Sequence, residues 1–254
     1  MRGSERRRAI EDLLRDHGEV SVEGLASALA VTASTIRRDL AGLTAEGRIT
    51  RTYGGAVTTA HAEPTVRHRS SLAAAQKDAI GRWAATQVHD GETVLLDAGT
   101  TVGRLARHLR ERATLTLVTN GLTAVTELLD GEAEVLVLGG RLRRVSQGLV
   151  GPLAELSLGR LTADRAFLGA DGLHPKHGIC EAELAQSRLK EQMLDRVREV
   201  YVLADSTKLG QAPFNAWTPL ARTWTLVTDD AATDAQLDPF RALAGVTVVT
   251  VPTA

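Results

Sequence analysis

Seven short stretches in the second part of this chain are apolar throughout and alternate with stretches of helical character. They lie at residues 93–97, 115–119, 134–138, 165–169, 200–204, 224–228 and 246–250. A strand that is apolar on both sides must be covered on both sides, as in a parallel sheet flanked by helices. The alternation therefore predicts an α/β fold in which a larger domain is built on a mainly parallel sheet.

The first 58 residues show a different pattern, typical of a winged helix-turn-helix. Apolar stripes predict three helices, the first over residues 6–17 and the second and third beginning after the capping residues Ser21 and Thr32. Residues 48–59 then alternate and contain Gly54-Gly55, as expected of a two-stranded ribbon with a tight turn. This ribbon would form the wing.

Two domains and a linker follow from these patterns. Residues 1–58 are predicted to be a winged helix-turn-helix domain, and residues 72–254 a larger α/β domain. The segment 59–71 between them lacks periodicity and contains Pro64, so we expect it to be a linker. A length of 254 residues is comfortable for two domains.

Composition excludes several classes of protein. No apolar run approaches the roughly 18 residues that cross a bilayer, and the N-terminus has no apolar signal core, so we expect a cytoplasmic protein without membrane contact. The single cysteine, Cys180, agrees with a reducing compartment. The net charge is −1, so any surface that binds nucleic acid must be local.

The third predicted helix carries such a surface opposite its apolar stripe. Arg37 and Arg38 lie there with small neighbours, and an arginine can donate two hydrogen bonds to guanine or pair with phosphate. The predicted DNA-binding residues are Ser34, Thr35, Arg37, Arg38, Arg51, Tyr53 and Gly54. The alternatives are an ordinary helix with solvated arginines and a winged helix that binds protein.

The residues VEGLASALAVTASTIRRDLAGLTAEGRITRTYGGAV resemble the N-terminal signature of the DeoR family of bacterial regulators. The motifs LLDAGTT, LVTNGL, VLGGRLR, FLGADGL and LADSTK resemble the effector domain of that family. The resemblance implies a repressor of carbohydrate genes that binds double-stranded operator DNA under the control of a phosphorylated sugar. It also implies a homo-oligomer, a dimer or a tetramer. Residues 1–58 would then be the DNA-binding domain, and residues 72–254 the domain for effector sensing and oligomerisation.

Each of the effector-domain motifs ends or follows a predicted strand. Ligands of open parallel sheets bind outside the carboxyl ends of the strands, so we expect these motifs to form one crevice. Gly99, Thr100 and Thr101 open a helix and can bind phosphate, for which Lys208 supplies a positive charge. The predicted effector-binding residues are Lys77, Asp97, Gly99, Thr100, Thr101, Asn120, Gly121, Gly140, Arg141, Gly169, Asp171, Gly172, Asp205, Ser206 and Lys208.

Structural roles are the alternative for several of these residues. Asp205 and Ser206 could cap the following turn while Lys208 is simply exposed. Asp97 could organise its loop, and Gly140-Arg141 could be part of a turn.

An enzyme is the rival interpretation of the second domain. Residues 76–101 are similar to the opening helix and phosphate loop of ribose-5-phosphate isomerases, including Lys77. Isomerisation needs a base, and Gln186 stands where related regulators often carry glutamate. Glutamine cannot serve as that base, although Glu181 and Glu183 lie nearby. We therefore predict no catalytic residues and no cofactor.

His174, His177 and Cys180 are candidate ligands for a zinc site. These residues are spaced by three in a segment with proline and glycine, but a fourth ligand is not obvious. We predict no metal.

Overall fold

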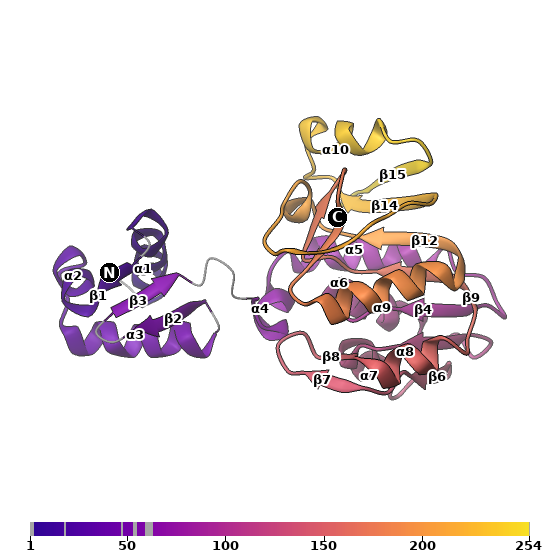
Figure 1. Cartoon of the computed structure of the whole chain (residues 1–254), viewed down its shortest axis with the longest axis horizontal. Coiled ribbons are helices and arrows are strands. Elements are labelled where there is room, and N and C mark those ends of the chain that lie inside the picture. The colour runs from indigo at the N-terminus through magenta and orange to yellow at the C-terminus, as the bar shows by residue number, and fades with distance from the viewer. Residues whose placement is uncertain (1–2, 18, 47, 53–54, 59–62, 254) are drawn as a thin grey trace. The chain divides into compact units, whose positions relative to one another are not determined.

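The computed structural model describes residues 3–17, 19–46, 48–52, 55–58 and 63–253 (Figure 1). The chain divides into two compact units, Met1–Arg69 and Ser70–Ala254. Each unit has its own hydrophobic core and is described by itself. No helix in the described ranges is long and apolar enough to cross a membrane.

The smaller unit is a winged helix-turn-helix, as the sequence predicts. Its helices are α1 (Gly3–His17), α2 (Val22–Ala28) and α3 (Ala33–Ala45), and its strands are β1 (Glu19–Ser21), β2 (Ile49–Thr52) and β3 (Gly55–Thr58). The three strands form an antiparallel sheet in the order β1-β3-β2. The short strand β1 was not predicted, because three residues are too few to show an alternation.

Capping residues and an apolar core hold the three helices. The Ser21 side chain accepts a hydrogen bond from Gly24 N at 3.0 Å, and the Thr32 side chain accepts one from Thr35 N at 3.2 Å, as expected for residues that begin α2 and α3. The core of the unit consists of the buried side chains Ile10, Leu14, Val22, Leu25, Ile36, Leu40, Leu43 and Ile49. Because Ile36, Leu40 and Leu43 of α3 point into this core, the opposite face of α3 is exposed to solvent.

A short helix lies at the end of the segment predicted to be a linker. Helix α4 spans Val66–Ser71, and the Thr65 side chain caps it by accepting a hydrogen bond from His68 N. Pro64 lies before the capping residue and outside the helix. The sequence did not predict this helix.

The larger unit is built on the parallel sheet that the seven apolar stretches predict. Its strands are β4 (Thr93–Leu96), β5 (Thr116–Thr119), β6 (Glu134–Val137), β9 (Ala163–Leu168), β12 (Val197–Leu203), β14 (Trp224–Asp229) and β15 (Val246–Val251). They run parallel in the order β15-β14-β12-β9-β4-β5-β6. All seven predicted strands are confirmed to within a few residues.

Helices cover both faces of this sheet (Figure 1). On one face lie α5 (Ala74–Ala85), α6 (Thr100–Leu109) and α7 (Leu122–Leu128), and on the other lie α8 (Pro152–Leu158), α9 (Leu184–Asp195) and α10 (Asp234–Arg241). Leu96 packs into the first layer and its neighbour Leu95 into the second. Successive strand residues point to opposite faces, which explains why these strands are apolar throughout.

Two small antiparallel pieces border the sheet. One is the hairpin of β7 (Arg141–Arg143) and β8 (Gly148–Val150), and the other is a sheet of β10 (Gly172–His174), β11 (Gly178–Glu181) and β13 (Ala216–Thr218). The hairpin is attached to the carboxyl end of β5, because Leu149 N donates to Asn120 O at 2.7 Å. A short 3-10 helix, Ser206–Lys208, follows β12.

Candidate functional site

The carboxyl ends of the parallel strands bring the predicted effector motifs to one edge of the sheet. From the central strand β4 the chain builds β5 and β6 on one side and then returns to build β9, β12, β14 and β15 on the other. The reversal of direction lies between β4 and β9. α/β proteins commonly bind ligands at such a switch point, outside the strand ends, and we call this region the crevice.

Asp97, which directly follows β4, links the two sides of this crevice. Its Oδ2 atom accepts a hydrogen bond from Gly169 N, at the end of β9, at 3.0 Å. It also forms an ion pair with Lys190 of α9. The Asp97 side chain is almost fully buried, so it holds the ends of β4 and β9 together beneath the surface.

Lys190 is the central cation of a buried cluster that the sequence analysis missed. Its Nζ donates hydrogen bonds to Asp97 Oδ2 and, at 2.8 Å, to Gly169 O. The same Nζ lies 3.0 Å from Glu181 Oε1 on β11. Only 3% of its side chain is exposed. The signal was present in the sequence, since Lys190 lies on the same stripe of α9 as Leu189, Met193 and Leu194.

The cluster holds two carboxylates against one ammonium, and the pKa values reflect this. Burial opposes the charge on Lys190, but the carboxylates of Asp97 and Glu181 outweigh burial and raise the pKa of Lys190. Burial also raises the pKa of Glu181 to about 8, because Lys190 only partly offsets burial and the nearby Asp171 and Asp97 add to it. Lys190 is therefore already neutralised by its own neighbours.

Replacing Glu181 by glutamine should flatten the pH dependence of stability. Because the pKa of Glu181 is raised from 4.5 to about 8, the folded chain holds a proton that the unfolded chain releases in this range. Glu181 therefore makes the free energy of unfolding fall as the pH rises from 4.5 towards 8. Thermal unfolding of both proteins across this range measures the slope, and equal slopes would contradict the assignment.

A second charged group lies beside the crevice, around Asp205 at the end of β12. Lys77 Nζ and Lys208 Nζ each lie 4.0 Å from Asp205 Oδ2. Lys77 also donates to Leu72 O at 2.8 Å, and Lys208 donates to Ala170 O, next to Gly169, at 2.5 Å. Two ammonium groups thus approach one carboxylate at the end of β12.

The start of α6 offers a polar surface to an anion. Gly99 precedes the helix, and a Cβ at Gly99 would meet no atom within 4 Å, so the backbone is open there. Thr123 fixes the loop, because its hydroxyl donates to Gly99 O at 3.0 Å. Thr100 and Thr101 are the first helical residues, where backbone N–H groups lack intrahelical acceptors.

Asn120, at the end of β5, adds an amide that is only partly used. Its Nδ2 donates to Leu149 O at 3.2 Å, whereas its buried Oδ1 has no hydrogen-bond partner among the described residues. A buried acceptor without a donor is unfavourable unless something supplies one. Asn120 is therefore suited to a ligand hydroxyl or amide donor.

Several other predicted effector residues have structural contacts. Ser206 donates from its N and Oγ to Asp229, at 2.7 Å and 2.9 Å. A Cβ at Gly121 would lie 2.7 Å from Ala98 Cα, and one at Gly172 would lie 2.4 Å from Gln211 O. Packing alone requires glycine at these two positions.

Gly140 and Arg141 lie where the chain enters the β7–β8 hairpin. Gly140 has φ +130, and a Cβ there would lie 2.6 Å from Val150 O, so this position also requires glycine. The Arg141 side chain is 63% exposed and pairs with Glu183 at 3.0 Å. Arg143, which is buried, pairs with the same carboxylate at 2.9 Å. Glu183 thus connects the hairpin to the start of α9.

The residues considered for zinc lie on the small sheet. The rings of His174 and His177 lie 4.8 Å apart between centroids, whereas buried Cys180 accepts a hydrogen bond from Phe214 N at 3.3 Å. Among the residues that the structure describes, no three His, Cys, Asp or Glu side chains are arranged to hold a metal ion.

The predicted DNA-reading face of α3 is open to solvent. Ser34, Arg37 and Arg38 are exposed, and Thr35 is half-buried beside the cap Thr32. Arg37 lies 3.7 Å from Glu23, and Arg38 has no carboxylate within 4 Å among the described residues. Arg51 lies on β2 opposite Ala56, while Tyr53 and Gly54 fall outside the described residues.

Internal ion pairs occupy other arginines of the smaller unit. Buried Asp39, on the inner side of α3, accepts a hydrogen bond from Arg6 at 2.5 Å, and Arg7 bonds to Glu46 at 3.0 Å. Arg48 pairs with Glu11. These arginines attach α1 and the end of α3 to the unit, which leaves Arg37 and Arg38 as the exposed cations of α3.

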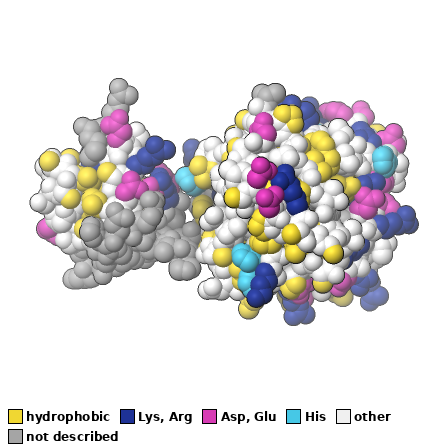
Figure 2. All heavy atoms as spheres, turned by 90° about the horizontal axis from the view of Figure 1, so that it is seen from above, with side chains coloured by type: hydrophobic (Ala, Val, Ile, Leu, Met, Phe, Trp, Pro, Cys, Tyr) yellow, Lys and Arg dark blue, Asp and Glu magenta, His cyan; other side chains and the backbone are white. Residues whose placement is uncertain are grey.

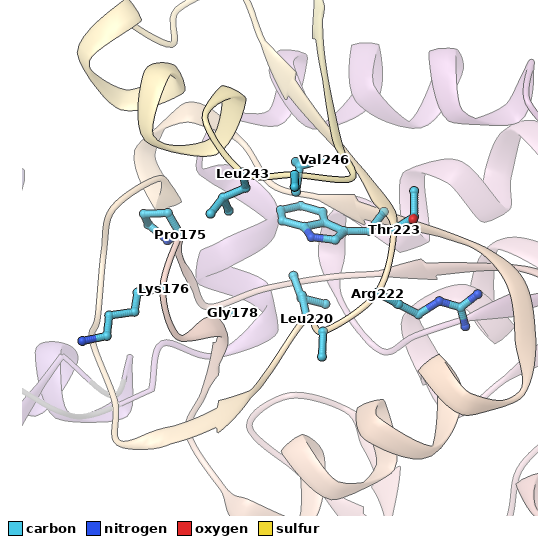
Figure 3. Close-up of a pocket in the computed structure, with 11 residues that line it drawn as sticks. Pro175, Lys176, Gly178, Leu220, Arg222, Thr223, Leu243 and Val246 are labelled. Carbon is cyan, nitrogen blue, oxygen red and sulfur yellow. The ribbon is translucent and has the colours of Figure 1, made fainter.

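A cavity at the opposite edge of the sheet does not coincide with the crevice. It has a volume of about 430 Å³, and Leu220, Leu243 and Val246 line it together with Trp224 (Figure 3). Trp224 and Val246 are the first residues of their strands, so this cavity lies at the amino ends. The surface of the larger unit in Figure 2 mixes acidic and basic side chains.

Comparison with known sequences agrees with both units. The family "DeoR-like helix-turn-helix domain" matches residues 6–61, and the family "DeoR C terminal sensor domain" matches residues 72–230. The chain is 36% identical to the HTH-type transcriptional regulator GlpR of Haloferax volcanii, over 97% of each chain. It is 35% identical to the HTH-type transcriptional repressor GlcR of Bacillus subtilis, over 89% of this chain and 88% of that one.

Among solved structures, ribose 5-phosphate isomerase A from Methanocaldococcus jannaschii matches 52% of each chain, with 19% identity and a TM-score of 0.39. The two relatives that match most of this chain, GlpR and GlcR, are named as transcriptional regulators. The two family matches and these relatives show that the chain belongs to the DeoR family of DNA-binding transcriptional regulators.

Proposed function

We propose that the protein is a cytoplasmic repressor of carbohydrate-metabolism genes, whose binding to double-stranded operator DNA is controlled by a phosphorylated sugar. We also propose that it acts as a homo-oligomer, a dimer or a tetramer. The winged helix reads the operator through Arg37 and Arg38, and the crevice of the larger unit binds the effector. The relatives that are named as repressors, such as GlcR, support the first part of this proposal.

The charge distribution at the crevice is the observation that carries the effector assignment. Lys190 is paired with Asp97 in its own buried cluster, whereas Lys77 and Lys208 both lie near Asp205. Two ammonium groups close together at the end of β12 favour an anion such as a phosphate. The open start of α6 favours the same kind of group, because helix N-termini stabilise negative charge.

A sugar would supply the donors that the crevice lacks. Asn120 Oδ1 is a buried acceptor without a donor, and Gln186 Oε1 on α9 is another. Sugar hydroxyls donate hydrogen bonds and would satisfy both atoms. A ligand with a phosphate at one end and hydroxyls along its length therefore fits the mixture of groups at this edge of the sheet.

A thermal-shift screen tests the effector assignment. We expect phosphorylated sugars to raise the unfolding temperature, since a ligand present at 100 times its Kd adds about 2.7 kcal/mol to the free energy of unfolding. The parent sugars without phosphate and inorganic phosphate alone serve as controls. A response to the parent sugars that equals the response to their phosphates would contradict the phosphate assignment.

Replacing Lys208 by alanine should weaken effector binding by about 1 to 3 kcal/mol, since it removes one of the two ammonium groups at Asp205. Effector-free binding to operator DNA should remain near that of the unchanged protein, because Lys208 belongs to the larger unit. Isothermal titration with the effector and DNA binding at fixed salt measure the two effects. Lys176→Ala, which removes an exposed lysine from the turn after β10, is the matched control.

The same variant tests how the two sites are coupled. An effector changes operator affinity only by its differential affinity for the two arrangements of the protein, typically about 1 to 3 kcal/mol, and operator DNA must change effector affinity by the same factor. If Lys208→Ala responds to the effector at the same concentration as the unchanged protein, Lys208 is not a phosphate contact.

A further inference from the structure

One edge of the seven-stranded sheet is open and apolar. Strand β6 is the last strand on its side, so its outer backbone groups face no further strand among the described residues. Its side chains Leu136 and Val137 are 39% and 47% exposed. An exposed apolar strand at a sheet edge is a template for pairing with another strand, and soluble proteins usually protect such edges with lysine, proline or a bulge. The sequence of β6, EVLV, contains neither lysine nor proline.

Two leucines of α8 extend this surface. Leu153 and Leu156 lie one turn apart and are 64% and 61% exposed. A Cβ at Gly139, two residues beyond the end of β6, would lie 3.9 Å from Leu153 Cβ, so α8 is adjacent to the end of the edge strand. We call the side chains of Leu136, Val137, Leu153 and Leu156 the apolar edge.

The opposite edge of the same sheet has a different composition. The exposed residues of the other edge strand, β15, are Thr247 and Thr250, and its valines are at least half-buried. The two edges therefore differ in what they present to solvent, although neither has an outer neighbour among the strands that the structure describes. Large apolar side chains exposed together on a soluble protein mark a surface that contacts another molecule.

We infer that the apolar edge is a contact surface between two copies of this chain, with their β6 strands side by side and antiparallel about a two-fold axis. A two-fold contact uses the same surface on both copies and closes, so no apolar edge stays exposed. Antiparallel strands exchange N–H and C=O groups across the axis, which satisfies the open backbone of both edges.

Charge placement favours this self-pairing. The only charged side chain of β6 is Glu134, at the first position of the strand. In an antiparallel pair it lies towards the uncharged end of the other copy, and like charges do not face each other. The leucines of α8 add apolar area beside the paired strands, as is usual at the centre of homodimer contacts.

The inference rests on the oligomer in the proposed function and assigns its surface; it does not depend on the effector. Two copies related by a two-fold axis would also carry two winged helices, as palindromic operators require. The full-length chain should therefore have at least twice the mass of one chain in light scattering over a range of concentrations. A monomer at every concentration would overturn the inference and leave the effector assignment standing, since the thermal-shift screen tests that part separately.

Two matched lysine substitutions test the edge itself. Val137→Lys places a charge on the outer edge of β6, and we expect it to raise the dissociation constant of the dimer by about a hundredfold, because the charge would be buried without a partner. Thr250→Lys on β15 makes an equivalent change at the other edge and should leave the constant unchanged. Equal effects of the two variants, or none from Val137→Lys, would overturn the assignment.

Two further measurements do not depend on a substitution in the strand. Leu153→Ser/Leu156→Ser should also weaken the dimer, and circular dichroism checks that this variant is folded. Amide hydrogen exchange of the unchanged protein should show slow exchange over residues 134–138 in concentrated solution and faster exchange on dilution. Exchange there that is independent of concentration would contradict pairing of the β6 strands.

Discussion

Replacing Lys190 by methionine is expected to lower the free energy of unfolding by about 3 to 5 kcal/mol, the range found when one partner of a buried ion pair is removed. The substitution leaves Asp97 as a buried carboxylate without its cation and removes the ammonium group that contacts Glu181. Methionine keeps most of the volume of the lysine side chain, so the loss reports charge and hydrogen bonding more than packing. Urea unfolding followed by circular dichroism measures it.

The neighbouring residue of the same helix supplies the control. Arg188→Met removes a cation whose side chain is 69% exposed and which pairs with Glu155. Exposed ion pairs contribute about 0 to 1 kcal/mol, so this variant should unfold close to the unchanged protein. If the two substitutions cost the same, Lys190 does not have the role that the buried cluster gives it.

Replacing Arg38 by alanine should weaken operator binding by about 1 to 3 kcal/mol if the side chain reads a base, and the loss should be confined to one operator position. If Arg38 contacts phosphate, binding to all sequences should weaken alike. The side chain is exposed on α3 opposite the buried Ile36 and Leu40, so the fold should be unaffected. Fluorescence anisotropy at fixed salt, with operators mutated one position at a time, separates the two cases.

Arg8→Ala is the matched control for this experiment. Arg8 is exposed on α1, so the variant removes the same charge from the same unit without changing the reading face of α3. It should lose no discrimination between operator positions. A DNA affinity of Arg38→Ala equal to that of the unchanged protein would show that the exposed face of α3 does not bind DNA through Arg38.

The seven strands of the sheet could be predicted from the sequence because each is buried on both faces. Residues such as Leu95 and Leu96 must both be apolar when adjacent side chains enter different helical layers, and this produces runs that no loop would show. The strands β7, β8, β10 and β13 have three residues each and could not be recognised in the same way. They are held by pairing with distant segments and not by their own pattern.

For the crevice, the sequence indicated which loops meet but not which charges pair. Strand ends of a parallel sheet share one edge, so the approach of Asp97 to Gly169 follows from topology alone. The partner of Asp97, however, is Lys190, which lies 93 residues away and on a helix that the prediction did not connect with the crevice. A lysine on an otherwise apolar stripe of a helix is consistent with a buried ion pair. The sequence pattern alone is equally consistent with a lysine whose ammonium group reaches solvent.

The sequence by itself determined the two domains, the winged helix with its exposed arginines, the parallel sheet and the edge at which its motifs meet. These features follow from local rules of periodicity, capping and strand direction, which act over a few residues at a time. The tertiary structure alone decided that Lys190 is neutralised by Asp97 and Glu181 while Lys77 and Lys208 share Asp205. Charge balance depends on distances between segments far apart in the chain, and only packing of the helices on the sheet sets those distances.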